Sequence, residues 1–181
     1  MSKGLKLREI GEHFSAKLSK IKLCLFDVDG ILTDGKVTWM GEELGFNRSF
    51  HVRDVYGLKI LQQAGIEVGI ITGGDSAAIH VGFEMLGIKY VYTGKEDKRG
   101  AFKDVLEKTG FSAEETLYMG DEFFDLPILK QVGFSATVPN ASEEIREAVD
   151  YITVCPAGEA SAREVIDILR YAQGIEPKVE Y

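Results

Sequence analysis

The sequence predicts an α/β fold in which a Rossmann-like, mostly parallel sheet carries helices on both faces. Short apolar runs of strand length alternate with segments of helical periodicity, which is typical of such sheets. A β-hairpin is expected at residues 36–52, just after the first strand, because alternating apolar residues flank a turn there. No insertion is large enough to form a cap domain, so we expect the 181 residues to form a single domain.

The expected strands are short and apolar. The first, residues 23–26, reads Leu-Cys-Leu-Phe, although its pattern alone leaves a short buried helix open. The next three strands also end in polar or glycine-rich loops, which indicate a change of chain direction. The strands after the first cover residues 68–71, 90–92, 117–119, 134–138 and 151–154. The two strands of the hairpin are expected at residues 36–40 and 46–52.

The expected helices lie between these strands, and three of them end at glycines. They cover residues 58–64, 76–86, 98–108, 127–132, 143–149 and 160–172. Ser112 and Glu115 have the spacing of a capping box, and Pro127 suits the first turn of a short helix. Residues 1–20 are amphipathic and are expected to form an N-terminal helix, whereas residues 174–181 are expected to form a loose tail.

Composition and charge narrow the classes of function. The chain is 45% apolar and 28% charged, which is ordinary for a soluble domain. Its formal net charge of -8 disfavours a nucleic-acid partner or an anionic membrane surface. Cys24 and Cys155 are far apart in the sequence and are expected to be free thiols in a reducing compartment. Because the sequence has no signal-peptide pattern and no apolar run long enough to cross a membrane, the expected location is the cytoplasm.

Two carboxylates, Asp27 and Asp29, follow the first strand. Open α/β sheets bind ligands at the carboxyl ends of their strands. Because two close carboxylates repel each other, the pair indicates a bound cation or a shared proton. The alternative is a simple Asp-Gly turn at Gly30, which would be the better explanation if this were the only polar strand end in the chain.

Polar residues also follow other strands, namely Thr72, Lys98 and Asp121. Right-handed crossovers would bring them to the same edge of the sheet as the first two acids. Acids alone would repel a phosphate, but acids that hold Mg²⁺, helped by a lysine and backbone N–H groups, would bind one. Structural roles are the alternatives: Thr72 would cap a helix, Lys98 would be solvated and Asp121 would lie in a turn.

In this order the segments resemble the four motifs of the haloacid dehalogenase-like phosphatases. The matching positions are residues 27–35, Thr72, Lys98 and residues 120–125. The finer resemblance is to the small, capless branch that includes the 3-deoxy-D-manno-octulosonate-8-phosphate phosphatases of lipopolysaccharide biosynthesis. Residues 32–35, 41–44, 50–54, 56–57, 120–121 and 125–127 carry this finer resemblance.

The resemblance implies a Mg²⁺-dependent phosphatase that works through an aspartyl-phosphate. Asp27 would be the nucleophile. Asp29 would protonate the leaving sugar oxygen and later take a proton from the hydrolytic water. Mg²⁺ would be held by the Asp27 carboxylate, the Asp29 backbone carbonyl and the Asp121 carboxylate. By this resemblance, the expected substrate is the small phosphorylated sugar acid 3-deoxy-D-manno-octulosonate 8-phosphate, which would give the free sugar acid and phosphate.

The resemblance also assigns binding roles. Thr72, Gly73 and Lys98 would hold the phosphoryl oxygens, and Asp125 would orient Lys98 or a metal-bound water. As the structural alternative, Asp125 would cap the helix that follows it. The residues expected to contact the sugar acid are His51, Arg53, Asp54 and Lys59.

The sequence departs from the family pattern at positions that recognise the sugar acid. Gly74 stands where the family usually has Arg, Gly82 stands at another basic position, and Lys59 keeps its charge. A nonulosonate 9-phosphate or another small sugar phosphate is therefore an alternative substrate. A catalytically silent scaffold or regulatory subunit is the alternative of another class. A mutase is disfavoured because nothing large would shield its intermediate from water.

The hairpin predicts assembly. It carries Val37, Trp39, Phe46 and Phe50, which is more apolar surface than an isolated hairpin should expose. We expect a symmetric homo-oligomer, a tetramer by resemblance to the family, in which hairpins of neighbouring subunits pack together. The expected sugar-acid residues would then lie near a subunit boundary.

Overall fold

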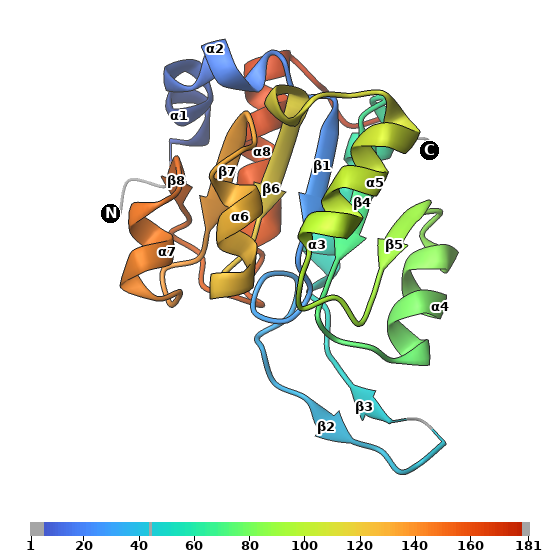
Figure 1. The fold of residues 1–181 in the computed structure, drawn as a ribbon. Coiled ribbons are helices and arrows are strands. Elements are labelled where there is room, and N and C mark those ends of the chain that lie inside the picture. Colours follow the sequence, from blue (N-terminus) through green and yellow to red (C-terminus); the bar gives the residue numbers. More distant parts are fainter. Residues whose placement is uncertain (1–5, 44, 179–181) are drawn as a thin grey trace.

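The computed structural model describes residues 6–43 and 45–178. Parts of the expected N-terminal helix, hairpin and tail, at residues 1–5, 44 and 179–181, lie outside the described residues. Six parallel strands form one sheet in the order β5-β4-β1-β6-β7-β8 (Figure 1). Their bounds are β1 (Leu23–Phe26), β4 (Glu67–Ile71), β5 (Tyr90–Tyr92), β6 (Thr116–Met119), β7 (Phe134–Thr137) and β8 (Tyr151–Ile152).

β1 lies inside the sheet, between β4 and β6. All four of its residues are buried, as expected of an apolar strand that is covered on both faces. Leu23 pairs with Glu67 of β4 and Thr116 of β6, so the three parallel strands begin at the same level of the sheet. The residues that follow them therefore meet at one edge of the sheet, which is the lower edge in Figure 1.

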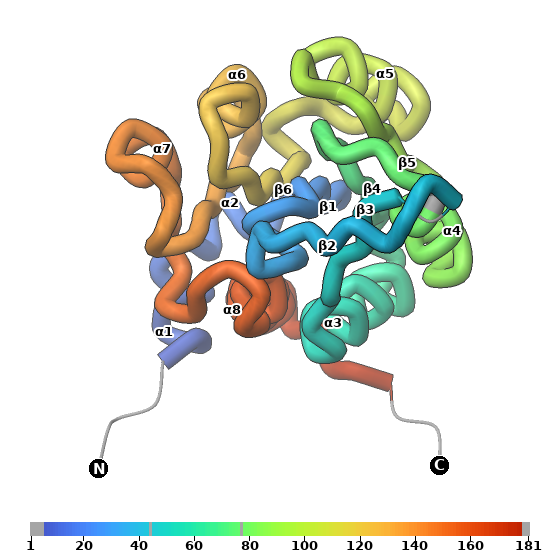
Figure 2. The backbone as a smooth tube through the Cα atoms, turned by 90° about the horizontal axis from the view of Figure 1, so that it is seen from below, coloured from blue at the N-terminus to red at the C-terminus, as the bar shows by residue number. Residues whose placement is uncertain are grey.

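Helices cover both faces of the sheet, as Figure 2 shows in a view from that edge. One face carries α1 (Leu7–His13), α2 (Ser15–Leu18), α3 (Val52–Gln63), α4 (Ala77–Met85) and α8 (Ser161–Gln173). The other carries α5 (Arg99–Thr109), α6 (Leu126–Leu129) and α7 (Glu143–Glu147), and two short 3₁₀ turns are η1 (Ala113–Glu115) and η2 (Phe123–Asp125). The α/β class with a mostly parallel sheet is thus confirmed. Within the described ranges, no helix is long and apolar enough to cross a membrane.

The hairpin forms a separate two-stranded antiparallel sheet of β2 (Thr38–Trp39) and β3 (Phe46–Asn47). It projects away from the carboxyl edge of the main sheet (Figure 1). The rings of Trp39 and Phe46 pack edge to face with centroids 5.0 Å apart, yet the residues are 56% and 48% exposed.

The largest differences from the expected bounds lie in the hairpin, at the start of α3 and in the N-terminal helix. Residues 48–52 do not continue the hairpin strand, because His51 caps α3 and that helix begins at Val52 instead of residue 58. The His51 Nδ1 atom accepts a hydrogen bond of 3.2 Å from the Arg53 backbone N–H, which satisfies one free donor of the first turn. The expected N-terminal helix is divided into α1 and α2 at Phe14, whose ring packs edge to face against Phe134 at 5.2 Å.

Candidate active site

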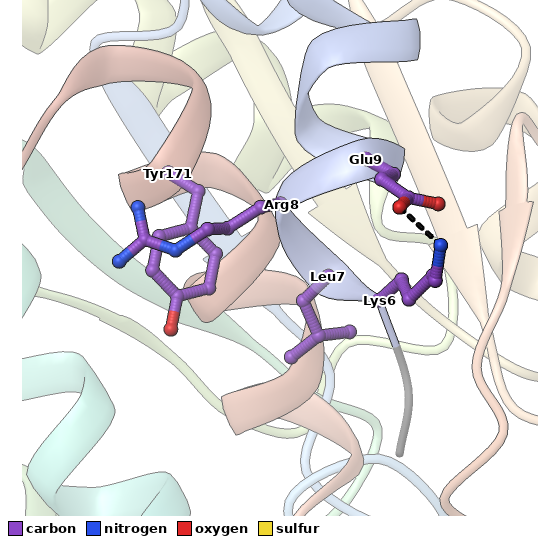
Figure 3. Close-up of a pocket in the computed structure, with 5 residues that line it drawn as sticks. All are labelled: Lys6, Leu7, Arg8, Glu9 and Tyr171. Carbon is purple, nitrogen blue, oxygen red and sulfur yellow. Dashed lines mark hydrogen bonds and ion pairs between the residues drawn. The ribbon is translucent and has the colours of Figure 1, made fainter. Parts of the chain in front are cut away.

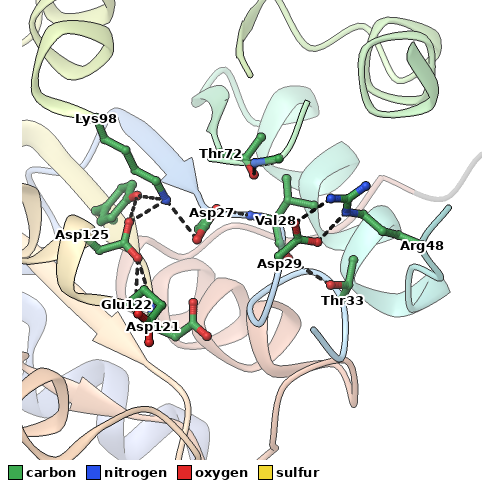
Figure 4. Close-up of polar contacts among 12 residues, drawn as sticks. Asp27, Val28, Asp29, Thr33, Arg48, Thr72, Lys98, Asp121, Glu122 and Asp125 are labelled. Carbon is green, nitrogen blue, oxygen red and sulfur yellow. Dashed lines mark hydrogen bonds and ion pairs between the residues drawn. The ribbon is translucent and has the colours of Figure 1, made fainter. Parts of the chain in front are cut away.

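Three carboxylates meet at the carboxyl edge of the sheet (Figure 4). Asp27 directly follows β1, Asp121 follows β6 and Gly120, and Asp125 ends η2. One oxygen of each lies within 4.8 Å of one oxygen of the others. Asp27 is 2% exposed and Asp125 is completely buried, so the cluster is largely withdrawn from water.

Lys98 supplies a positive charge to this cluster. Its side chain is completely buried, and its Nζ atom lies 2.9 Å from Asp27 and 2.7 Å from Asp125. Nζ also lies 3.4 Å from the Tyr118 hydroxyl and 4.6 Å from the centroid of the Phe124 ring. A solvated role for Lys98, the alternative open from sequence alone, is therefore wrong.

Asp125 holds the cluster in place with both of its oxygens. Oδ1 accepts hydrogen bonds from Lys98 and, at 2.5 Å, from the Tyr118 hydroxyl. Oδ2 accepts from the backbone N–H groups of Asp121 and Glu122, each at 3.1 Å. Sequence reasoning missed Tyr118, because a tyrosine in a buried strand gives no sign of the partner that its hydroxyl will reach. Asp125 thus joins Lys98, Tyr118 and the backbone of the loop after β6 in one set of contacts.

The charge of the cluster fits a divalent cation. Burial raises the pKa of Asp27 to about 7, against the opposing effect of Lys98. Burial and the charges of Asp27 and Asp125 raise the pKa of Asp121 to about 8. The Oδ1 atom of Asp121 is buried and has no hydrogen-bond partner within the described part of the chain. Three carboxylates face one lysine, and such oxygen donors are the ligands that Mg²⁺ prefers.

Gly30 allows the acids to approach each other. Its backbone is left-handed, with φ of 85°, which favours glycine. In addition, a Cβ atom at this position would overlap the carboxylate of Asp121. The Asp-Gly turn that was an alternative to a site is therefore present as part of the site.

Asp29 lies apart from the three clustered carboxylates, in contact with Arg48 (Figure 4). Arg48 follows β3 of the hairpin, and its Nε and Nη2 atoms donate to the two oxygens of Asp29 at 2.5 and 2.8 Å. Sequence reasoning missed Arg48. The available signal was a basic residue in the hairpin that follows the first acidic loop.

Thr72 and Gly73 follow β4 and face the same edge. Thr72 is 1% exposed, and its Oγ1 atom accepts a 3.1 Å hydrogen bond from the Gly74 backbone N–H. This contact leaves the hydroxyl hydrogen of Thr72 to donate to another acceptor. A Cβ atom at Gly73 would meet nothing within 4 Å, so the backbone there borders open space.

The expected sugar-acid residues lie outside the carboxylate cluster, on α3 or at its start. His51 caps α3, and Arg53 and Lys59 are exposed. Asp54 is buried, and its Oδ1 atom accepts a 2.6 Å hydrogen bond from the Arg163 backbone N–H in the first turn of α8. Burial raises the pKa of Asp54 to about 6. Among the described residues, none of these four has a hydrogen bond or ion pair to the cluster.

A surface cavity of about 350 Å³ lies at the opposite end of the sheet, between α1 and α8 (Figure 3). Arg8 lies over the Tyr171 ring, 4.2 Å from its centroid, and Lys6 forms an ion pair with Glu9. The charged side chains of this cavity therefore have partners within it, and none of its residues belongs to the carboxylate cluster.

The buried acids, Lys98 and Thr72 at the strand ends define the class of haloacid dehalogenase-like hydrolases. The family model described as haloacid dehalogenase-like hydrolase matches residues 90–164. The chain is 37% identical over 165 residues to the 3-deoxy-D-manno-octulosonate 8-phosphate phosphatase of Salmonella typhi, covering 91% of this chain and 87% of that protein. It is 39% identical to the enzyme of the same name from Haemophilus influenzae, covering 87% of each.

A solved structure agrees with these relatives. The Moraxella catarrhalis 3-deoxy-D-manno-octulosonate 8-phosphate phosphatase, in complex with a magnesium ion, a phosphate ion and a KDO molecule, superposes with a TM-score of 0.85 at 36% identity. The match covers 90% of this chain and 93% of that one. The chain belongs to the 3-deoxy-D-manno-octulosonate 8-phosphate phosphatase family, and the resemblance seen in its motifs is confirmed.

Proposed function

We propose that the chain hydrolyses 3-deoxy-D-manno-octulosonate 8-phosphate to the free sugar acid and phosphate, in a Mg²⁺-dependent reaction. The observation that carries this proposal is the buried Asp27, which Lys98 contacts at 2.9 Å and which lies within 4.8 Å of Asp121 and Asp125. A nucleophilic carboxylate, a lysine for the phosphoryl oxygens and oxygen ligands for a cation are the parts that phosphoryl transfer needs. Membership of the phosphatase family supports the named substrate.

In the first step, an Asp27 oxygen forms a bond to phosphorus while the bond from phosphorus to the sugar oxygen breaks. Asp29 gives its proton to the leaving sugar oxygen. In the second step, Asp29 takes a proton from water, whose oxygen attacks the phosphorus of the aspartyl-phosphate and releases Asp27. General acid and base help of this kind is worth about 10²–10⁴-fold.

The surrounding residues hold the phosphoryl group. Mg²⁺, held by the carboxylates of Asp27 and Asp121 and the backbone carbonyl of Asp29, would offset its negative charge. Lys98 and the Thr72 hydroxyl, with the N–H of Gly73, would bind its remaining oxygens. The contact of Asp125 with Lys98 keeps the ammonium beside the nucleophile.

A nonulosonate 9-phosphate or another small sugar phosphate is the alternative substrate, because Gly74 and Gly82 leave two positions of the family pattern uncharged. A catalytically silent scaffold is the alternative of another class. The buried arrangement of Asp27, Lys98 and Asp125 opposes it, since a scaffold has no need to bury such charges.

The proposal includes the setting of the enzyme. We infer a homotetramer that acts in the cytoplasm, in lipopolysaccharide biosynthesis, as a single domain. The exposed hairpin residues Trp39 and Phe46 support assembly, and the free thiols Cys24 and Cys155 support a reducing compartment. We propose neither a membrane nor a nucleic acid as a partner, because the net charge of -8 would repel their anionic surfaces.

The test is hydrolysis of a panel of phosphorylated sugar acids, with Mg²⁺ and with the metal removed by a chelator. We expect Mg²⁺-dependent release of phosphate, fastest with 3-deoxy-D-manno-octulosonate 8-phosphate, and none from the Asp27→Asn variant, which keeps the shape but loses the attacking oxygen. A faster reaction with a nonulosonate 9-phosphate would favour the alternative substrate. Absence of activity on the panel and on p-nitrophenyl phosphate would favour the scaffold.

A further inference from the structure

Arg48 is a partly buried cation on an otherwise exposed hairpin. Its side chain is only 7% exposed, whereas Phe46, Asn47 and Ser49 beside it are exposed. Nε and Nη2 grip both oxygens of Asp29, and Nη1 donates to the Phe46 carbonyl at 3.2 Å. These three hydrogen bonds fix the orientation of the guanidinium, and its Nε and Nη2 atoms face the active site.

Gly74 provides the space that Arg48 fills. A Cβ atom at position 74 would lie 2.7 Å from the Arg48 Nη2 atom and 2.9 Å from the Asp29 Oδ2 atom. The backbone of Gly74 is not in the left-handed region, so its conformation does not require glycine. The missing side chain is explained by the Arg48 guanidinium and the Asp29 carboxylate, which together occupy its volume. Arg48 thus supplies a positive charge beside position 74 from a different element of the fold.

The partner of Arg48 must change during the proposed reaction. Asp29 has to exchange protons with the leaving group and with water. It cannot do so while both of its oxygens accept hydrogen bonds from a guanidinium. A second carboxylate offers Arg48 the same planar, two-oxygen partner. The substrate class of the proposed function carries such a group, at the end of the sugar opposite the phosphate.

The surroundings of Arg48 leave room for that end of the substrate. On the side of the hairpin base, a polar cavity of about 210 Å³ is lined by Asp34, Lys36, Thr38, Asn47, Arg48 and Ser49. Hydroxyl, amide and charged side chains of this kind suit the hydroxyl groups of a sugar. A substrate placed in this way would meet Asp27 at its phosphate end, then Asp29, and then Arg48 at its carboxylate end.

We propose that Arg48 is a specificity residue that binds the carboxylate of the sugar acid and, in doing so, releases Asp29. This inference rests on the proposed function, because it assigns a residue to the substrate of the same site. It explains how a chain with Gly74 in place of a basic residue still recognises an acid.

The experiment compares Arg48→Gln with wild type on two substrates, 3-deoxy-D-manno-octulosonate 8-phosphate and its analogue with the carboxylate reduced to an alcohol. Charged hydrogen bonds of this strength predict that Arg48→Gln raises KM for the acid by about 10- to 100-fold. KM for the alcohol should change by less than about threefold, because that substrate lacks the contact. The matched control is Arg8→Gln, which removes one guanidinium at the opposite end of the sheet and should alter neither KM.

A relocation variant tests the assignment of space. The double variant Arg48→Gln/Gly74→Arg places a guanidinium at position 74 instead, and it should recover part of the preference for the acid over the alcohol. Gly74→Arg alone should not increase that preference, because its side chain collides with Arg48. Equal losses on acid and alcohol, or no change in KM for the acid, would overturn the inference while the proposed function stands. Failure of wild type to hydrolyse either this acid or a nonulosonate 9-phosphate would overturn the proposed function and the inference together.

Discussion

Asp27 and Asp29 stand two positions apart, yet their surroundings suit them to different chemistry. Asp27 is buried beside Lys98, where the proposed attack on the phosphoryl group would proceed without competing water. The side chain of Asp29 is 32% exposed, so water can reach it once Arg48 binds the substrate instead, as proposed above. Pairs of acids that differ in this way commonly divide the nucleophilic and proton-transfer roles between them.

Asp29→Asn should slow both the formation and the breakdown of the phospho-enzyme, by about 10²–10⁴-fold, because the amide cannot transfer the proton. Its affinity for Mg²⁺ should stay near that of wild type, since Asp29 is proposed to bind the metal through its backbone. Single-turnover kinetics and a Mg²⁺ titration measure the two effects. The matched variant is Asp121→Asn, and an equal loss of Mg²⁺ affinity in both would contradict the backbone assignment.

Asp54 should make stability depend on pH. Its pKa of about 6 lies above the ordinary 3.8, mainly through burial, and the Arg163 N–H and the charges of His51, Arg53 and Arg163 act in the opposite direction. The neutral form is therefore favoured in the folded chain. Its contribution to the free energy of unfolding is complete below pH 3.8 and is lost as the pH rises through 6.

The loss amounts to about 3 kcal/mol relative to Asp54→Asn, which does not titrate. Urea unfolding of both proteins at several pH values, at one protein concentration, measures this difference. We expect the free energy of unfolding of the variant to rise relative to that of wild type between pH 4 and 7. A constant difference over that range, together with a ¹³C carboxyl titration of Asp54 near pH 4, would show that the pKa is not raised.

At the scale of elements, the start of α3 combines a structural contact with a predicted functional residue. His51 caps this helix through the Arg53 N–H. His51→Ala should lower the free energy of unfolding by about 1 kcal/mol, and His51→Asn, which keeps a cap, should restore most of it. Urea unfolding measures both. Equal stability of the two variants would show that the cap contributes nothing, whereas a raised KM in the stable Asn variant would support a role in substrate binding.

The strands and the acids that follow them could be predicted because each depends on a local pattern. An apolar run that ends in Asp27 or Asp121 gives both the strand and its polar end, and parallel pairing brings those ends together. The sequence shows Arg48 only as a basic residue of the hairpin, and its contact with Asp29 could not be predicted, since that contact depends on how the hairpin folds back. The start of α3 was missed for a similar reason: Val52 and Val55 favour a strand locally, and the cap by His51 outweighs that preference.

At the scale of the whole molecule, the site is open because the hairpin is the only element that projects beyond the carboxyl edge in the described part of the chain (Figure 1). The hairpin has two distinct surfaces. Arg48 faces the site, whereas Trp39 and Phe46 are exposed. Phe50 differs from this pair because its ring packs against Phe83 of the same chain at 5.5 Å. Trp39 and Phe46 are therefore the better candidates for contacts between subunits.

Replacement of Trp39 and Phe46 by Ser should dissociate the proposed tetramer, because it removes the largest exposed aromatic surface of the hairpin. Light scattering measures the assembly. Hydrolysis of the sugar acid phosphate should fall more than that of p-nitrophenyl phosphate, since the free hairpin would no longer hold Arg48 in place. The control is Val154→Ser, which removes an exposed apolar side chain distant in sequence from the hairpin. A wild-type chain that is a fully active monomer at assay concentration would contradict the assembly.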